Sequence, residues 1–228
     1  TATGRRVMER ASATVKKVFL ELGGKSANVV LDDANFEAVL GGACFVCIHG
    51  GQGCAITTRL LLPRSRFDEG VAIAKAAFEG WLFGDPTNPG NLQGPQISRR
   101  QQERVLGYIE RAKQDGARCV TGGGIPKHLT RGFYVEPTLI VGADPRSQIA
   151  QEEVFGPVLV ALPYEDDADA VRIANDSIYG LSGAVHGSPE RARKVARAIR
   201  TEPMSVNGGG WFDVDTPWES LPRTARKA

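Results

Sequence analysis

Short apolar runs alternate with longer amphipathic stretches along most of the 228-residue chain. Apolar runs of about four to eight residues bounded by glycine or proline are typical of buried strands, whereas apolar residues three to four apart are typical of helices. This alternation predicts an α/β fold with a mostly parallel sheet flanked by helices. The expected strands span residues 15–20, 27–31, 59–62, 117–121, 138–141, 158–162, 183–186 and 204–206. The expected helices span residues 5–13, 34–48, 65–83, 98–114, 166–174 and 189–199.

The charge balance and the cysteine content narrow the functional classes. The chain has 28 basic and 26 acidic residues, and this net charge of +2 does not favour nucleic acid as a partner. No apolar run is long enough to cross a bilayer, so we expect no membrane partner. The four cysteines show no even disulfide framework, which fits a reducing compartment and predicts a cytoplasmic location.

Cys54 is the strongest candidate for a nucleophile. It directly follows the turn Gly50-Gly51-Gln52-Gly53, and glycines let a substrate approach the backbone closely. Backbone N–H groups at such a turn can lower the pKa of a thiol and stabilise an oxyanion on a bound carbonyl. A cysteine at this position can equally be a small buried apolar residue. Position alone leaves both interpretations open.

Glu21 is the second candidate for a chemical role. It ends the apolar run 15–20 and precedes Gly23 and Gly24. Ligands of parallel sheets bind beyond the carboxyl ends of the strands, where such a carboxylate could reach them. From spacing alone, an exposed charge or an ion pair with Lys25 is the simpler interpretation.

Two other chemistries have weaker support. Cys44 and Cys47 have the C-x-x-C spacing of a zinc ligand pair. Both lie in an apolar helical stretch and no second ligand pair follows at finger spacing, so we expect them to pack in the core without a metal. A cysteine acyltransferase would need a histidine base near Cys54, and only His49 is close to it in sequence.

Several motifs occur in a characteristic order. They are E-L-G-G-K-S at residues 21–26, G-Q-G-C at 51–54, E-E-V-F-G-P-V at 152–158, N-D-S-I-Y-G-L-S at 175–182, and Val206-Asn207. In this order, and over residues 1 to about 215, the chain resembles the aldehyde dehydrogenase superfamily. The first two motifs look like the glutamate and cysteine motifs of that family.

The resemblance implies that an aldehyde is oxidised to a carboxylic acid with NAD or NADP. Cys54 would attack the aldehyde carbonyl and carry a thiohemiacetal and then a thioester, with its own N–H helping to hold the oxyanion. Glu21 would be the general base that activates water to hydrolyse the thioester. The implied cofactor-binding residues are Gly4, Leu22, Gly23, Glu153 and Phe155. Asn207 would support the site without a chemical role.

The resemblance also implies a division of the chain. Residues 1–21 would be the last helix and strand of a Rossmann-like cofactor-binding domain, and residues 22–208 the catalytic domain. Residues 209–228 depart from the family pattern and are expected to be a disordered tail. Family chains are about twice as long, so we expect a fragment that is inactive alone and a homo-oligomer in the full-length form. The alternative is a non-catalytic fragment or pseudoenzyme that only folds or associates with a partner.

Overall fold

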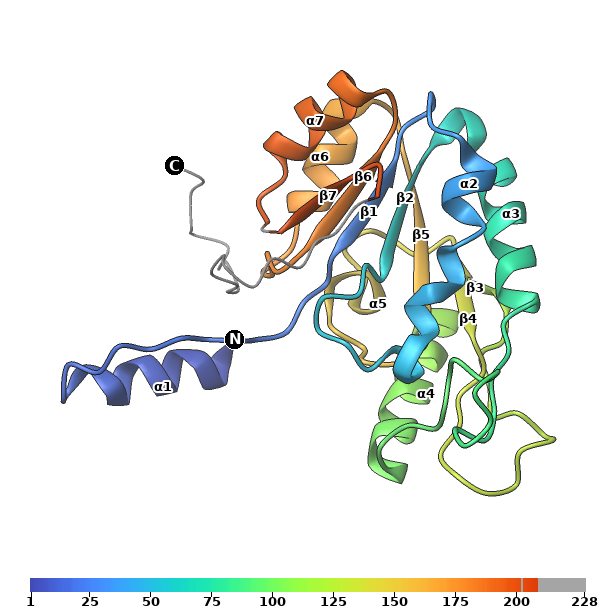
Figure 1. The fold of residues 1–228 in the computed structure, drawn as a ribbon, viewed down its shortest axis with the longest axis horizontal. Coiled ribbons are helices and arrows are strands. Elements are labelled where there is room, and N and C mark those ends of the chain that lie inside the picture. The colour runs from blue at the N-terminus through green and yellow to red at the C-terminus, as the bar shows by residue number, and fades with distance from the viewer. Residues whose placement is uncertain (202, 209–228) are drawn as a thin grey trace.

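A seven-stranded sheet forms the centre of the molecule (Figure 1). The computed structural model describes residues 1–201 and 203–208. The strand order is β3-β4-β5-β2-β1-β6-β7, and every neighbouring pair is parallel except β3 and β4. The strands are β1 (Ala27–Val30), β2 (Arg59–Pro63), β3 (Arg118–Thr121), β4 (Thr138–Val141), β5 (Val158–Tyr164), β6 (Gly183–His186) and β7 (Met204–Val206). The predicted mostly parallel sheet is therefore confirmed.

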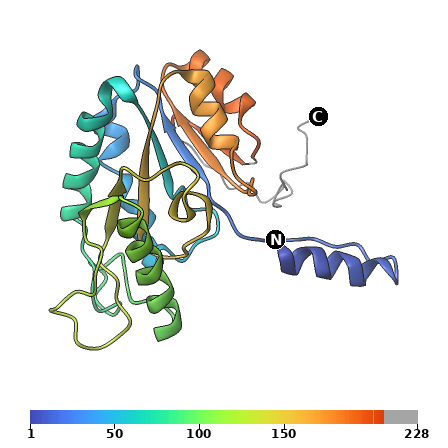
Figure 2. The ribbon, with the colours of Figure 1, turned by 180° about the vertical axis from the view of Figure 1, so that it is seen from behind.

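Helices cover both faces of this sheet, as the two opposite views in Figures 1 and 2 show. One apolar core joins the sheet to α4, α5, α6 and α7, and the other joins it to α2, η1 and α3. Val29 faces the first core and Val30 the second, so alternate residues of β1 are buried on opposite sides. The helices are α1 (Ala2–Ser12), α2 (Phe36–Leu40), η1 (Ala43–Gly51), η2 (Arg64–Arg66), α3 (Phe67–Glu79), α4 (Arg99–Gln114), α5 (Gln148–Gln151), α6 (Asp167–Asn175) and α7 (Pro189–Ala198).

Two expected elements differ from the sequence-based prediction. The predicted strand over 15–20 is wrong, because this extended segment pairs with no strand among the described residues. It follows α1 and lies with it away from the sheet (Figure 1). The predicted helix over 34–48 is interrupted at Gly41 and Gly42, where α2 ends and the 3₁₀ helix η1 begins. Glycine stabilises helices poorly, which accounts for the break.

Local signals explain several element boundaries. The Ser98 hydroxyl accepts a hydrogen bond from the Gln101 N–H at the start of α4, and the Asp166 carboxylate caps α6 through the Asp169 N–H. Both are standard N-caps that satisfy otherwise unpaired helical N–H groups. The domain division at residue 21 stays a prediction, and the expected tail over 209–228 lies outside the described residues.

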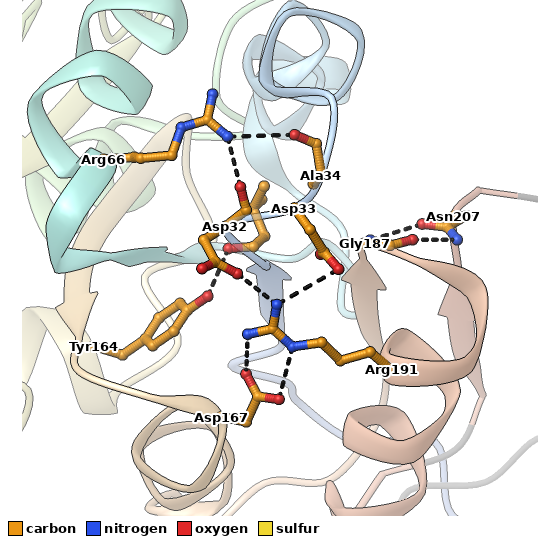
Figure 3. A network of polar contacts seen from close by, with 10 residues as sticks. Asp32, Asp33, Ala34, Arg66, Tyr164, Asp167, Gly187, Arg191 and Asn207 are labelled. Carbon is orange, nitrogen blue, oxygen red and sulfur yellow. Dashed lines mark hydrogen bonds and ion pairs between the residues drawn. The ribbon is translucent and has the colours of Figure 1, made fainter.

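Ion pairs fix the edge of the sheet at which the parallel strands end (Figure 3). Arg191 of α7 binds both carboxylate oxygens of Asp167 at 2.7 and 2.9 Å and also contacts Asp32, which follows β1. The Asn207 side chain forms two hydrogen bonds with the backbone of Gly187, at 2.8 and 2.9 Å. Asn207 thus ties the end of β7 to the end of β6 at the carboxyl edge of the sheet, and the support of the site expected of it stays a prediction.

Arg59 connects the sheet to α6 and to the segment before β1. Its buried guanidinium donates to the carbonyl oxygens of Lys25, Ile173 and Ala174, at 2.8 to 2.9 Å. Arg59→Met should lower the free energy of unfolding by about 3 kcal/mol or more, because three buried carbonyls lose their donor. Urea denaturation measures this change. The control Arg64→Met removes an exposed ion pair with Glu165 and should change stability little. Equal losses in both variants would contradict this assignment.

Candidate active site

Four of the five motifs found in the sequence converge at one edge of the sheet, whereas Val206-Asn207 ends β7 at the opposite edge. Each of these four directly precedes a parallel strand: residues 21–26 lead into β1, 51–58 into β2, 152–157 into β5 and 175–182 into β6. These four strands are neighbours in the order β5-β2-β1-β6, so their amino ends lie side by side. The expectation that Glu21 lies at the carboxyl end of a strand is therefore wrong. Glu21 precedes β1 and lies at the amino edge of the sheet.

The two candidate catalytic side chains are in contact. The Cys54 thiol lies 3.4 Å from a carboxylate oxygen of Glu21, although 33 residues separate them. Both side chains line a pocket of about 1020 Å³ whose wall is largely apolar, with Phe19, Phe45 and Ile56 among its residues. Cys54 is half-buried and Glu21 is exposed. A nucleophile and a candidate base therefore open into the same space, large enough for a small substrate.

Burial raises the pKa of the Cys54 thiol, and the hydrogen bond and negative charge of Glu21 raise it further. The backbone N–H groups of Cys54 and Ala55 act in the opposite direction. The thiol is thus mainly protonated at neutral pH and donates its proton toward Glu21. His49 lines the same pocket, but the observed hydrogen-bond partner of the thiol is Glu21. The contacts of the thiol therefore favour a cysteine–glutamate pair over a cysteine–histidine pair.

Glycines bring the cysteine turn against the 152–157 segment. Gly50 and Gly51 have φ values of +67° and +70°, a backbone conformation that residues with a side chain rarely adopt. A Cβ on Gly51 would lie 2.0 Å from the carbonyl oxygen of Gly156. The turn before Cys54 can therefore contact this neighbouring segment only because residue 51 has no side chain.

The absence of side chains at Gly23 and Gly24 likewise lets the 21–26 segment approach the 152–157 segment and the cysteine turn. A Cβ on Gly23 would lie 2.3 Å from a carboxylate oxygen of Glu153, and one on Gly24 would lie 2.3 Å from the carbonyl oxygen of Cys54. The Gly24 N–H donates to the Glu153 carboxylate at 3.1 Å. Burial raises the pKa of Glu153. Gly23 therefore lies against the carboxylate of Glu153, and the next residue, Gly24, lies against the backbone of Cys54.

The other expected cofactor residues are Gly4, Leu22 and Phe155. Gly4 is buried in α1, where a Cβ would lie 2.8 Å from the Leu22 side chain. Phe155 has a φ of +58°, an uncommon conformation for a residue with a side chain. Such strain is typical of functional segments and is tolerated where surrounding contacts hold the backbone.

Sequence reasoning missed the residues that hold these segments. Gln101 of α4 donates to the carbonyl oxygens of Val154 and Phe155, at 3.2 and 2.8 Å. Arg104 of the same helix donates to the Glu153 carbonyl at 2.8 Å. No local sequence pattern indicates these long-range contacts. From the sequence, polar residues on a charged helix such as α4 are expected to face the solvent.

The structure also bears on the predictions for Cys44 and Cys47, for metal binding and for membrane spans. Cys44 and Cys47 are buried in the core beside α2 and α3, as predicted. Among residues 1–201 and 203–208, no cluster of histidine, cysteine, aspartate and glutamate could hold a metal ion. No helix in this part of the chain has both the length and the apolar character needed to span a membrane.

Comparison with known proteins identifies the family. The model of the aldehyde dehydrogenase family matches residues 1–219. The chain is 43% identical over 221 residues to a 3-succinoylsemialdehyde-pyridine dehydrogenase of a Pseudomonas species, covering 96% of this chain and 46% of that protein. It is 38% identical over 219 residues to a betaine aldehyde dehydrogenase of Sinorhizobium fredii, covering 95% of this chain and 45% of that protein. The chain belongs to the aldehyde dehydrogenase family.

Solved structures show the same fold. The crystal structure of a Mycobacterium tuberculosis aldehyde dehydrogenase complexed with NAD+ matches with a TM-score of 0.92 and 41% identity, over 98% of this chain and 46% of that one. A mutant aldehyde dehydrogenase C from Pseudomonas syringae, in complex with NAD+ and octanal, matches with a TM-score of 0.91 and 36% identity, over 96% and 46%. The chain thus spans about half the length of these relatives.

Proposed function

We propose that this chain carries the catalytic residues of an enzyme that oxidises an aldehyde to a carboxylic acid with NAD or NADP. The observation that carries the proposal is the 3.4 Å contact between the Cys54 thiol and the Glu21 carboxylate in one pocket. Family membership and the NAD+ bound to the similar solved structures support it. The activity is proposed for a form as long as the relatives. That this chain is inactive alone, and that the longer form is a homo-oligomer, stay predictions.

Cys54 is the proposed nucleophile. Its sulfur attacks the aldehyde carbonyl, forming the carbon–sulfur bond of a thiohemiacetal, while the thiol proton leaves toward Glu21. The backbone N–H of Cys54 is the proposed donor to the carbonyl oxygen as negative charge develops there. Oxidation at the same carbon converts the adduct on Cys54 into a thioester.

Glu21 is the proposed general base for the hydrolytic half of the reaction. Glu21 is exposed, so the proton received from the thiol can pass to bulk water. The carboxylate can then take a proton from a water molecule beside the Cys54 adduct, because it lies within reach of the sulfur. The water then attacks the thioester carbon, the carbon–sulfur bond breaks, and the acid leaves. Cys54 regains a proton and can react again.

The residues beside Cys54 fit a dinucleotide cofactor. The half-buried carboxylate of Glu153 lies against the backbone of Gly23. The carboxylate can accept hydrogen bonds from the two hydroxyls of a ribose, and the absence of a side chain at Gly23 lets a flat ring pass close to the chain. When bound, NAD or NADP supplies the acceptor for the hydride removed from the substrate carbon. Glu153 and Gly23 would hold it, with Leu22 and Phe155 alongside and Gly4 supporting Leu22.

Labelling the thiols with iodoacetamide tests the interaction of Cys54 with Glu21 in this chain directly. We expect Cys54 to react before the buried Cys44 and Cys47. Because Glu21 raises the pKa of Cys54, Glu21→Gln should speed labelling of Cys54 at pH 7 by roughly two- to tenfold and move its pH profile to lower pH. Peptide mass spectrometry measures each site, with Cys119 as the internal control. The variant Glu37→Gln, an exposed carboxylate of α2, should leave the rates unchanged. Equal labelling of Cys54 and Cys44 in the native protein would refute the assignment.

A further inference from the structure

A second, much smaller cavity lies behind the catalytic segments, between the amino ends of β1 and β6. It offers about 10 Å³ to the centre of a water molecule, which is the space that a single water needs. Its wall includes Lys25 and Ser26 before β1, Ser182 before β6, and Thr201 after α7. No carboxylate lines it among the residues that the structure describes.

Residues of this wall carry buried polar atoms that make no hydrogen bond within the described part of the chain. Among them are the Lys25 ammonium nitrogen Nζ and the Thr201 hydroxyl oxygen Oγ1. Lys25 is 1% exposed and Thr201 is 3% exposed, so bulk water does not reach them. A buried polar group without a partner is costly, and a buried ammonium is especially so. Burial, together with the nearby charge of Arg59, lowers the pKa of Lys25 to about 7, against smaller opposing effects of Glu153 and Glu152.

We propose that this cavity is a binding site for one water molecule that accepts a hydrogen bond from Lys25 Nζ and donates one to Thr201 Oγ1. The cavity has the size of one water, and the two unsatisfied atoms supply a donor and an acceptor in its wall. Buried waters are found where polar groups of the protein otherwise lack partners. Arg59 and Arg200 also line the cavity. The Arg59 guanidinium and Nη2 of Arg200 donate to backbone carbonyls, and Nη1 of Arg200 is a further donor that the wall offers to the same water.

The water would stabilise the base of both catalytic segments. Lys25 directly follows Gly24, whose N–H holds Glu153. In the same wall, the Ser182 hydroxyl donates to the carbonyl of Ala55, the residue after Cys54, at 2.6 Å, and lies 2.8 Å from the Ser26 hydroxyl. The site therefore joins the segment of Glu21, the turn of Cys54 and the end of α7.

A high-resolution crystal structure of the chain tests the proposal. We expect one oxygen peak within about 2.6–3.2 Å of both Lys25 Nζ and Thr201 Oγ1. A dry cavity, or a direct hydrogen bond from Lys25 Nζ to a protein group, would overturn it. The alternative occupant is a small anion such as chloride. An anomalous peak in the cavity after a bromide soak would therefore also overturn the proposal. An oxygen peak in the native crystal with no anomalous peak after the soak supports it.

A matched pair of variants isolates the hydroxyl of Thr201. Thr201→Val keeps the shape of the side chain without its oxygen and should lose the peak, whereas Thr201→Ser keeps the oxygen and should retain it. A peak that persists unchanged in Thr201→Val would refute the bridging role. The native structure decides between water, anion and dry cavity even if a variant fails to fold, and the outcome does not depend on the proposed dehydrogenase activity.

Discussion

Replacing Cys54 by alanine should abolish aldehyde oxidation in a form of the enzyme as long as its relatives. The expected loss of turnover is roughly 10⁴-fold or more, the scale seen when an enzyme loses its nucleophile. The physical reason is that no sulfur remains to form the covalent adduct, and no other cysteine lines the pocket among the described residues. NADH formation, followed by absorbance with a panel of simple aldehydes, measures the loss.

The control for this experiment is Cys119→Ala. Cys119 is half-buried like Cys54 but lies on β3, away from the motifs that precede β1 and β2. This variant should keep turnover close to that of the native enzyme. Comparable activity in Cys54→Ala and the native enzyme would remove Cys54 from the reaction.

Replacing Glu21 by glutamine should separate the two halves of the reaction. The first turnover of NADH should persist, because the Cys54 sulfur remains and, without the charge of Glu21 that raises its pKa, the thiol can lose its proton to water instead. Steady-state turnover should fall by roughly 10²–10⁴-fold, the usual effect of losing a general base. Rapid-mixing kinetics measures both phases in the full-length form. Steady-state turnover equal to that of the native enzyme would show that Glu21 is not the base.

The sequence was sufficient to predict the sheet because both of its faces are buried. Apolar runs such as 59–62 and 158–162 are continuous, as expected for strands covered by helices on both sides, and they became β2 and β5. The run 15–20 also carries β-branched and aromatic residues, but it contains two lysines and pairs with no strand among the described residues. A strand depends on a neighbour as well as on composition, and a single run cannot show whether a neighbour is present.

The contact between Glu21 and Cys54 was predictable only through the family motifs. Spacing alone favoured an exposed charge for Glu21, because nothing local indicates that the segments before β1 and β2 lie side by side. The glycines were the better physical signal. Gly24 and Gly51 are positions where another backbone approaches within a distance that a side chain would prevent. The contacts of Lys25, Gln101 and Arg59 depend on partners far away in sequence, and no local pattern predicts them.

The most direct test of the catalytic assignment is peptide mass spectrometry of the Glu21→Gln variant in its full-length form, quenched after mixing with NAD+ and an excess of aldehyde. If Cys54 carries the thioester and Glu21 serves its hydrolysis, the acyl group should accumulate on the peptide that contains Cys54. It should be absent from the peptides that contain Cys44, Cys47 and Cys119. An unmodified Cys54 peptide under conditions that still release NADH would contradict the assignment.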